Sequence, residues 1–352
     1  MSRYKDSWRD AFVVASLWLL VVAFTWRIGL AGRVLAGGDI FTYFYPYWAE
    51  ATRAIRSARL PLWNPLLFMG VPFLANSQVG FLYPLNWPLW LLFPAQRAVH
   101  LTIVLHLCLA ALNAYVWGRK SLELGPVGAW TVGAVFALSG YLGAQVEHVN
   151  QIQGLIWFPL MLTLYDRASS PRHRSCTRRV AFLGLTAVLG LVLLAGHTQT
   201  AFISLVGLVI YGVGPAVWHA LRGGDLRPIG RRAGLVVVAA VIGIAVAGAQ
   251  FVPTWELAGH SIRAEGLPFN ERVSFSLSPL YVGRALLPRF GEPVPPDHIE
   301  HVAYVGITGL ALAVGGLVTA VGHRREAGAV ASGLPRSDRL ALLFLTVIGL
   351  FF

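Results

Sequence analysis

The sequence predicts an all-α polytopic membrane protein. Of its 352 residues, 56% are hydrophobic and only 12% are charged, which is about half of the charged share of a soluble domain. The mean hydropathy is +0.62. The apolar residues fall into runs of about 17 to 25 residues, the length that crosses a bilayer as a helix. We therefore expect one transmembrane domain over residues 1–352.

These runs predict about eight complete spans and a truncated ninth. The complete spans lie near 11–30, 98–117, 126–145, 150–166, 180–196, 200–218, 233–252 and 303–321. The last run begins near Leu340 and reaches Phe352 after about 13 residues, too few to cross a bilayer. We therefore expect the natural chain to continue. The first span is longer than the apolar core of a cleaved signal peptide, which favours a signal anchor.

The basic residues predict the orientation. The net charge of +12 at first suggests a nucleic-acid partner, but the arginines cluster between apolar spans, so we expect no nucleic acid. With a cytoplasmic N-terminus, 18 of the 28 lysines and arginines fall in inner loops, as the positive-inside rule requires. The two long loops, 31–97 and 253–302, then lie on the extracytoplasmic side. Cys108 and Cys176 are expected at different depths, without a disulfide.

The first long loop has the pattern of an interfacial helix. Pro46 can begin a helix. The following residues place an apolar stripe on one side and charged residues on the other. The stripe holds Trp48, Ala51, Ile55 and Ala58, and the charged side holds Glu50, Arg53, Arg56 and Arg59. This pattern predicts a helix lying flat on the membrane. The prolines that follow preclude one regular helix, and the tryptophans among them suit the headgroup layer.

Two carboxylates stand out by their position at the predicted outer boundary. Asp39 follows two glycines just beyond the first span, and Glu147 with His148 ends the third span. A carboxylate at such a boundary can accept a proton from an incoming hydroxyl. We expect the proline-aromatic segment to cover Asp39 and keep water out. The alternative is that each acid caps a helix or pairs with an arginine.

Other polar residues have both a functional and a structural interpretation. His197 and Gln199, at an outer turn, suit either a sugar or phosphate site or a plain polar turn. Arg53, Arg56, Arg284 and Arg289 can bind a lipid phosphate through paired donors or touch headgroups alone. Thr102, His106 and Asn113 share one face of a span, which favours hydrogen bonds between helices. His298, Glu300 and His301 lie in a proline-rich turn, a poor cage for a metal, so no metal site is predicted.

Short motifs across most of the chain resemble the YfhO-type bacterial membrane proteins of the GT-C class of glycosyltransferases. In the first long loop they are GGD at 37–39, YP at 45–46, PLWNP at 61–65, Gly70, Pro72, Gln78 and YP at 83–84. Later in the chain they are EHVNQIQGLIWFPL at 147–160, GHTQ at 196–199, LLPRFG at 286–291 and YVGITGLALA at 304–313.

The resemblance implies a GT-C-like helical bundle with interfacial helices in two long extracytoplasmic loops. It implies a multi-pass protein of the bacterial cytoplasmic (inner) membrane that transfers a sugar from a polyprenyl-phosphate donor to an envelope glycan or teichoic-acid-like acceptor. Asp39 matches the acidic residue of the first outer loop, and Glu147 and His148 match the second, where a further polar catalytic residue is often found. No cofactor is implied, and the need for a divalent metal stays open. Members of the family are longer than this chain.

Two other function classes remain open. A transporter or flippase for a lipid-linked sugar would place polar and broken helices near the bilayer midplane, often in internal repeats. In this sequence the polar residues gather at the outer boundary and no convincing repeat is present. A non-catalytic scaffold of an envelope-assembly complex would tolerate loss of Asp39. No nucleotide-binding motif is present, which favours a lipid-linked donor over a nucleotide sugar.

Overall fold

In the structure, a computed structural model, the regular secondary structure of the described residues is helical apart from one short hairpin. It describes residues 2–262, 264–273, 283, 287, 302 and 304–322. Five of the described helices or helical segments are long and apolar enough to cross a membrane. They are Ala95–Lys120, Pro126–Glu147, Ser175–Leu194, Thr198–Leu221 and Arg227–Val246. The prediction of an all-α membrane protein is thereby confirmed at the level of helix content and hydropathy.

The elements follow one another in this order. The N-terminal part contains α1 (Ser2–Phe24), α2 (Trp26–Gly29), η1 (Ile40–Phe44), α3 (Tyr45–Arg56), β1 (Trp63–Asn64), β2 (Val71–Pro72), η2 (Ser77–Val79), η3 (Pro84–Asn86) and α4 (Trp87–Leu92). The middle contains α5 (Ala95–Lys120), α6 (Pro126–Ala137), α7 (Gly140–Ala144), η4 (Gln145–Glu147), α8 (Val149–Leu155) and α9 (Phe158–Ser169). The remainder contains α10 (Ser175–Leu194), α11 (Thr198–Leu221), α12 (Arg227–Val246), α13 (Gly248–Gly259), α14 (Phe269–Val273) and α16 (Ile307–Gly322). Strands β1 and β2 pair antiparallel.

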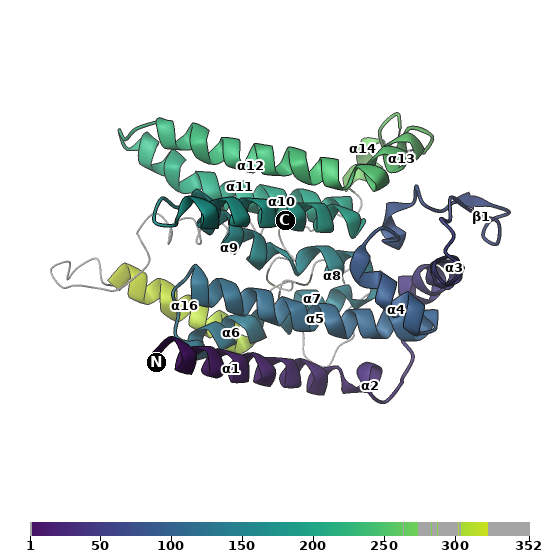
Figure 1. Cartoon of the computed structure of the whole chain (residues 1–352), viewed down its shortest axis with the longest axis horizontal. Coiled ribbons are helices and arrows are strands. Elements are labelled where there is room, and N and C mark those ends of the chain that lie inside the picture. Colours follow the sequence, from purple (N-terminus) through teal and green to yellow (C-terminus); the bar gives the residue numbers. More distant parts are fainter. Residues whose placement is uncertain are drawn as a thin grey trace.

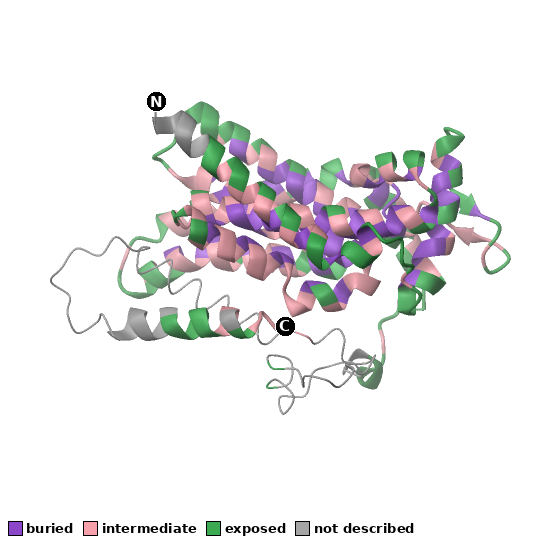
Figure 2. Ribbon diagram, turned by 90° about the horizontal axis from the view of Figure 1, so that it is seen from below, coloured by how far each residue is buried: buried purple, intermediate pink, exposed green. Residues whose placement is uncertain are grey.

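The long helices form a bundle, and the first long loop covers one end of it. Helix α5 packs against α1, α6 and α9, while α10 packs against α9 and α12. Figure 1 shows α3, α4 and the β1–β2 hairpin together at the end of the bundle where α2 lies, and the N-terminus at the other end. The buried residues lie along the inner faces of the bundle and under this loop (Figure 2). This loop end carries the candidate site.

Four predicted spans are interrupted, and two of them lie in the middle of the chain. The span predicted at 126–145 consists of α6, α7 and η4 in succession. The span predicted at 150–166 is divided into α8 and α9, because Pro159 in the first turn of α9 cannot donate a backbone hydrogen bond. At this break the Asn113 side-chain amide of α5 donates to the Ile156 carbonyl at 2.9 Å. An internal partner of this kind lets a broken helix persist in lipid.

A buried chain of hydrogen bonds joins the first loop to α5 and α8–α9. His106 Nδ1 lies 2.7 Å from the Thr102 carbonyl, so this nitrogen donates and Nε2 accepts. The Tyr83 hydroxyl lies 3.0 Å from His106 Nε2 and accepts from Trp157 Nε1 at 3.0 Å. This arrangement confirms that Thr102, His106 and Asn113 form hydrogen bonds between segments.

Helix α3 confirms the predicted apolar stripe and corrects the predicted charged side. Trp48 and Ala51 are fully buried. Glu50, however, is only 3% exposed and pairs with Arg53 at 2.9 Å and with Arg59. The ion pairs with the two arginines offset the desolvation penalty of the buried carboxylate, so Glu50 lies inside the loop instead of facing solvent. Ala58 lies beyond the end of the helix with φ 51, so it does not extend the stripe.

Candidate functional site

Hydrogen bonds hold the segment before Asp39 against the N-terminal end of α5. The Tyr45 hydroxyl lies 2.8 Å from the Leu35 carbonyl and 2.8 Å from His100 Nε2. Nearby, the Arg97 guanidinium donates to the carbonyls of Ile28 and Gly29 at the end of α2. These contacts hold the chain on both sides of the turn that leads to Asp39.

The backbone of that turn favours glycine, and the Glu147 side chain occupies the space where a Cβ would lie. Gly38 has φ +48, in the left-handed region that glycine adopts without penalty. A Cβ on Gly38 would lie 1.9 Å from Glu147 Oε2, and one on Gly37 would lie 3.1 Å from Glu147 Oε1. The Glu147 carboxylate therefore rests directly against the two glycines that precede Asp39.

The structure brings together the three residues that we predicted as catalytic. His148 Nε2 lies 3.5 Å from Asp39 Oδ2, while His148 Nδ1 lies 3.0 Å from Gln145 Oε1. Asp39 precedes η1 but makes no capping hydrogen bond with its side chain. The described contacts of Asp39 thus fit neither a helix cap nor an arginine pair. Its side chain is 55% exposed, so the proline-aromatic segment does not seal it from water as expected.

His197 lies close enough to His148 for the two rings to interact electrostatically. Burial, together with the charge of His148, lowers the pKa of His197 to about 4, so the ring is neutral at pH 7. His197 Nδ1 accepts from the Thr200 backbone N–H at 3.1 Å and lies 2.7 Å from the Thr200 hydroxyl. The ring proton is therefore on Nε2, and His197 can donate a hydrogen bond without carrying a positive charge.

The predicted polar residues around His197 occupy neighbouring turns. The Ser77 hydroxyl donates to the Gly196 carbonyl at 3.1 Å, which places the turn before His197 against η2. Gln78 follows Ser77 in η2 and is exposed. Gln199 is exposed in the first turn of α11. These side chains border the same turn, and the structure shows no contact between them and Asp39.

The predicted arginines have other partners. Arg56 donates to the carbonyls of Trp90 and Phe93 at 3.0 and 2.7 Å. It thereby satisfies carbonyls at the C-terminal end of α4, where a cation is also favoured by the helix dipole. Arg53 pairs with Glu50, although its side chain is 59% exposed. Neither arginine contacts the Asp39 group in the described residues, and Arg284 and Arg289 lie outside them.

Sequence reasoning missed Gln145 as a partner of His148. The only signal was its position three residues before the histidine, on the same side of a helical turn. Over the part of the chain that the structure describes, no group of three or more histidine, cysteine, aspartate and glutamate side chains is placed to hold a metal ion. His298, Glu300 and His301 are outside that part.

Comparison with known proteins assigns no family. No family model, no curated protein and no solved structure matches this chain. The resemblance to the YfhO-type proteins therefore stays a prediction from the motifs.

Proposed function

We propose that this protein is a membrane glycosyltransferase. It transfers a sugar from a polyprenyl-phosphate donor to a cell-envelope acceptor, at the end of the bundle that the first long loop covers. In this proposal the protein resides in the bacterial cytoplasmic membrane, with its N-terminus in the cytoplasm. The observation that supports it best is the contact between Asp39 with its preceding glycines and the adjacent pair Glu147–His148, two segments that are far apart in the sequence.

The geometry suits proton transfer during the reaction. The acceptor hydroxyl attacks the anomeric carbon of the donor, and its proton passes to the Asp39–His148 pair. The new glycosidic bond forms as the bond between that carbon and the phosphate oxygen breaks, and the electron pair leaves with the polyprenyl phosphate. A proton held by the pair lies between Asp39 Oδ2 and His148 Nε2, where each group stabilises the other's charge.

Glu147 and His197 have supporting roles in this proposal. Glu147 packs against the glycine turn and orients the acceptor or His148. His197, neutral at pH 7, donates a hydrogen bond from Nε2 to a sugar hydroxyl or a phosphate oxygen. Gln78 and Gln199 add polar contacts at the same turn.

The leaving phosphate requires positive charge at the interface. Arg53 is the better placed of the two described candidates, because its side chain is largely exposed although it pairs with Glu50. Arg56 is already bonded to two carbonyls and would support α4 instead. Arg284 and Arg289 remain the proposed additional phosphate ligands. A requirement for a divalent metal can be tested with a chelator in the same assay.

The experiment measures transfer of a labelled sugar from a polyprenyl-phosphate donor by the purified protein in lipid vesicles. Asp39→Asn keeps the shape of the side chain but cannot act as a base, so transfer should fall by about 100- to 10,000-fold. Glu123→Gln, which removes a carboxylate from the turn after α5, is the matched control and should transfer normally. If Asp39→Asn transfers at nearly the normal rate, the proposed mechanism is wrong.

The assay also separates the two alternatives. A transporter or flippase would move a labelled lipid-linked sugar between leaflets without transferring it, and a scaffold would do neither. The contacts of the buried polar residues of α5 indicate that these residues support the fold and do not line a transport path. Thr102 and His106 bond to each other, to Tyr83 and to Gln153, so their own polar atoms are used in contacts between segments.

A further inference from the structure

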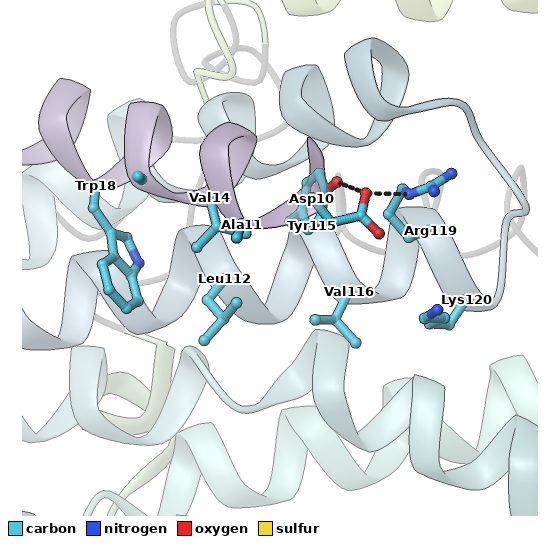
Figure 3. Close-up of a pocket in the computed structure, with 10 residues that line it drawn as sticks. Asp10, Ala11, Val14, Trp18, Leu112, Tyr115, Val116, Arg119 and Lys120 are labelled. Carbon is cyan, nitrogen blue, oxygen red and sulfur yellow. Dashed lines mark hydrogen bonds and ion pairs between the residues drawn. The ribbon is translucent and has the colours of Figure 1, made fainter. Parts of the chain in front are cut away.

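A cavity of about 410 Å³ lies between α1 and α5, away from the candidate site. Figure 3 shows the side chains that line it, from both helices. Val14 and Trp18 of α1 and Leu112 and Val116 of α5 give it apolar walls. The cavity lies along the middle of α1, from Asp10 to Trp18, whereas Asp39 lies beyond the C-terminal end of that helix. It therefore takes no part in the proposed sugar transfer.

One end of the cavity is polar and carries surplus positive charge. Asp10 Oδ1 accepts from the Tyr115 hydroxyl at 2.5 Å and from Arg119 Nε at 3.1 Å. Arg119 also donates to the Leu124 carbonyl at 2.7 Å. The charges of Asp10 and Arg119 cancel, so the charge of Lys120 makes the rim of the cavity positive overall. Within the described structure the Lys120 ammonium has no hydrogen bond or ion pair, and Figure 3 shows it beside Val116.

The other end of the cavity is closed by an aromatic ring. The Trp18 indole N–H donates to the Cys108 carbonyl at 3.0 Å and so bridges α1 to α5. Asp10 and Trp18 are separated by eight residues of helix, about 12 Å along its axis. The cavity is thus an apolar trough with a basic rim, a shape that matches an acyl chain below a phosphate.

The surroundings indicate which molecule fills the trough. Phe12 and Leu19 on α1 are largely exposed in the described structure, as expected for a helix that faces lipid tails. A dry apolar cavity beside lipid would forfeit van der Waals contacts that a lipid tail can make. The surplus charge at the rim favours an anionic headgroup over a zwitterionic one.

We propose that this trough binds one anionic phospholipid from the surrounding bilayer. Its phosphate lies against the Lys120 ammonium, and one acyl chain runs along the trough between Val14 and Leu112 towards Trp18.

Native mass spectrometry of the purified chain in detergent, titrated with phosphatidylglycerol or phosphatidylcholine, tests this proposal. Wild-type protein should retain one phosphatidylglycerol in preference to phosphatidylcholine. Lys120→Gln should weaken phosphatidylglycerol binding by about fivefold, the contribution of one lysine near an anionic surface. It should weaken phosphatidylcholine binding less, because the choline cation offsets the charge of the phosphate. Arg179→Gln removes an exposed charge from the first turns of α10 and is the matched control, so it should bind as wild type does.

A second variant tests the acyl-chain part of the site. Leu112→Trp fills the trough, so binding of both lipids should be lost, and Val116→Phe gives the same test if Leu112→Trp does not fold. Equal phosphatidylglycerol binding by Lys120→Gln and wild type would overturn the headgroup assignment. Undiminished lipid binding by a folded Leu112→Trp or Val116→Phe protein would show that the trough is not the lipid-binding site.

Discussion

Replacing Gly38 with alanine tests whether the position of the Glu147 carboxylate matters for function. Alanine at φ +48 costs about 1–2 kcal/mol of stability, because its Cβ crowds the backbone in the left-handed region. The new Cβ would also lie 1.9 Å from Glu147 Oε2. The carboxylate is the flexible end of a side chain, so it can retreat by roughly 1.5 Å to reach normal contact. A displacement of that size at a positioned group can slow a reaction by about 100-fold.

Gly32→Ala is the matched control for backbone strain. Gly32 also has a positive φ, of 69°, but nothing lies within 4 Å of its Cβ position. Both variants should therefore lose similar stability in thermal denaturation followed by tryptophan fluorescence. Only Gly38→Ala should lose sugar transfer, by about 10- to 100-fold. If both variants transfer equally well at a temperature where both are folded, the placement of Glu147 against the glycine turn has no functional role.

Three further outcomes are expected. Tyr83→Phe leaves the Trp157 indole N–H and a buried histidine nitrogen without their partner, so thermal denaturation should show a loss of about 1–3 kcal/mol, and an unchanged midpoint would contradict the hydrogen-bond chain. The folded pKa of His197 lies below the usual 6.5, so its contribution to stability should be present above pH 6.5 and be lost as the pH falls towards 4. His197→Asn should lack that component in a pH series of melting temperatures. For topology, Ser57→Cys should react with an impermeant thiol reagent on spheroplasts, whereas Cys176 should react only after permeabilisation, and the reverse pattern would overturn the predicted orientation.

Five of the eight complete spans were predictable to the level of a membrane-length helix, because hydropathy depends on residues that are contiguous in the chain. The interruption at Ile156 was less evident, because its stability depends on Asn113, which is 43 positions away in the sequence. Pro159 indicates locally that the helix breaks. It does not indicate which side chain bonds to the free carbonyl and so stabilises the break in lipid. Hydropathy alone therefore identifies the spans better than it identifies their interruptions.

The candidate site was predictable in its residues but not in its contacts. Asp39, Glu147 and His148 stood out because each lies at a predicted membrane boundary. Their contact depends on the turn at Gly38 and on where α7 and η4 end, and neither follows from periodicity. The charged side of α3 shows the same limit. Helical spacing placed Glu50 towards solvent, whereas Arg59, beyond the helix end, folds back to pair with it.

The exposure of Asp39 restricts how the proposed reaction can work. A carboxylate that is 55% exposed is surrounded by water, which weakens its interaction with any partner. Several aromatic rings of the first long loop pack on one another instead, since Phe81 stacks on Trp90 and Trp48 meets Trp90 edge to face. Within the described structure, water exclusion at Asp39 would therefore have to come from the substrates. A lipid-linked donor is suited to this, because its tail stays in the bilayer and its sugar would lie over the turn that carries Asp39. In this scheme the carboxylate becomes an effective base only when donor and acceptor are both bound, which limits hydrolysis of the donor by water.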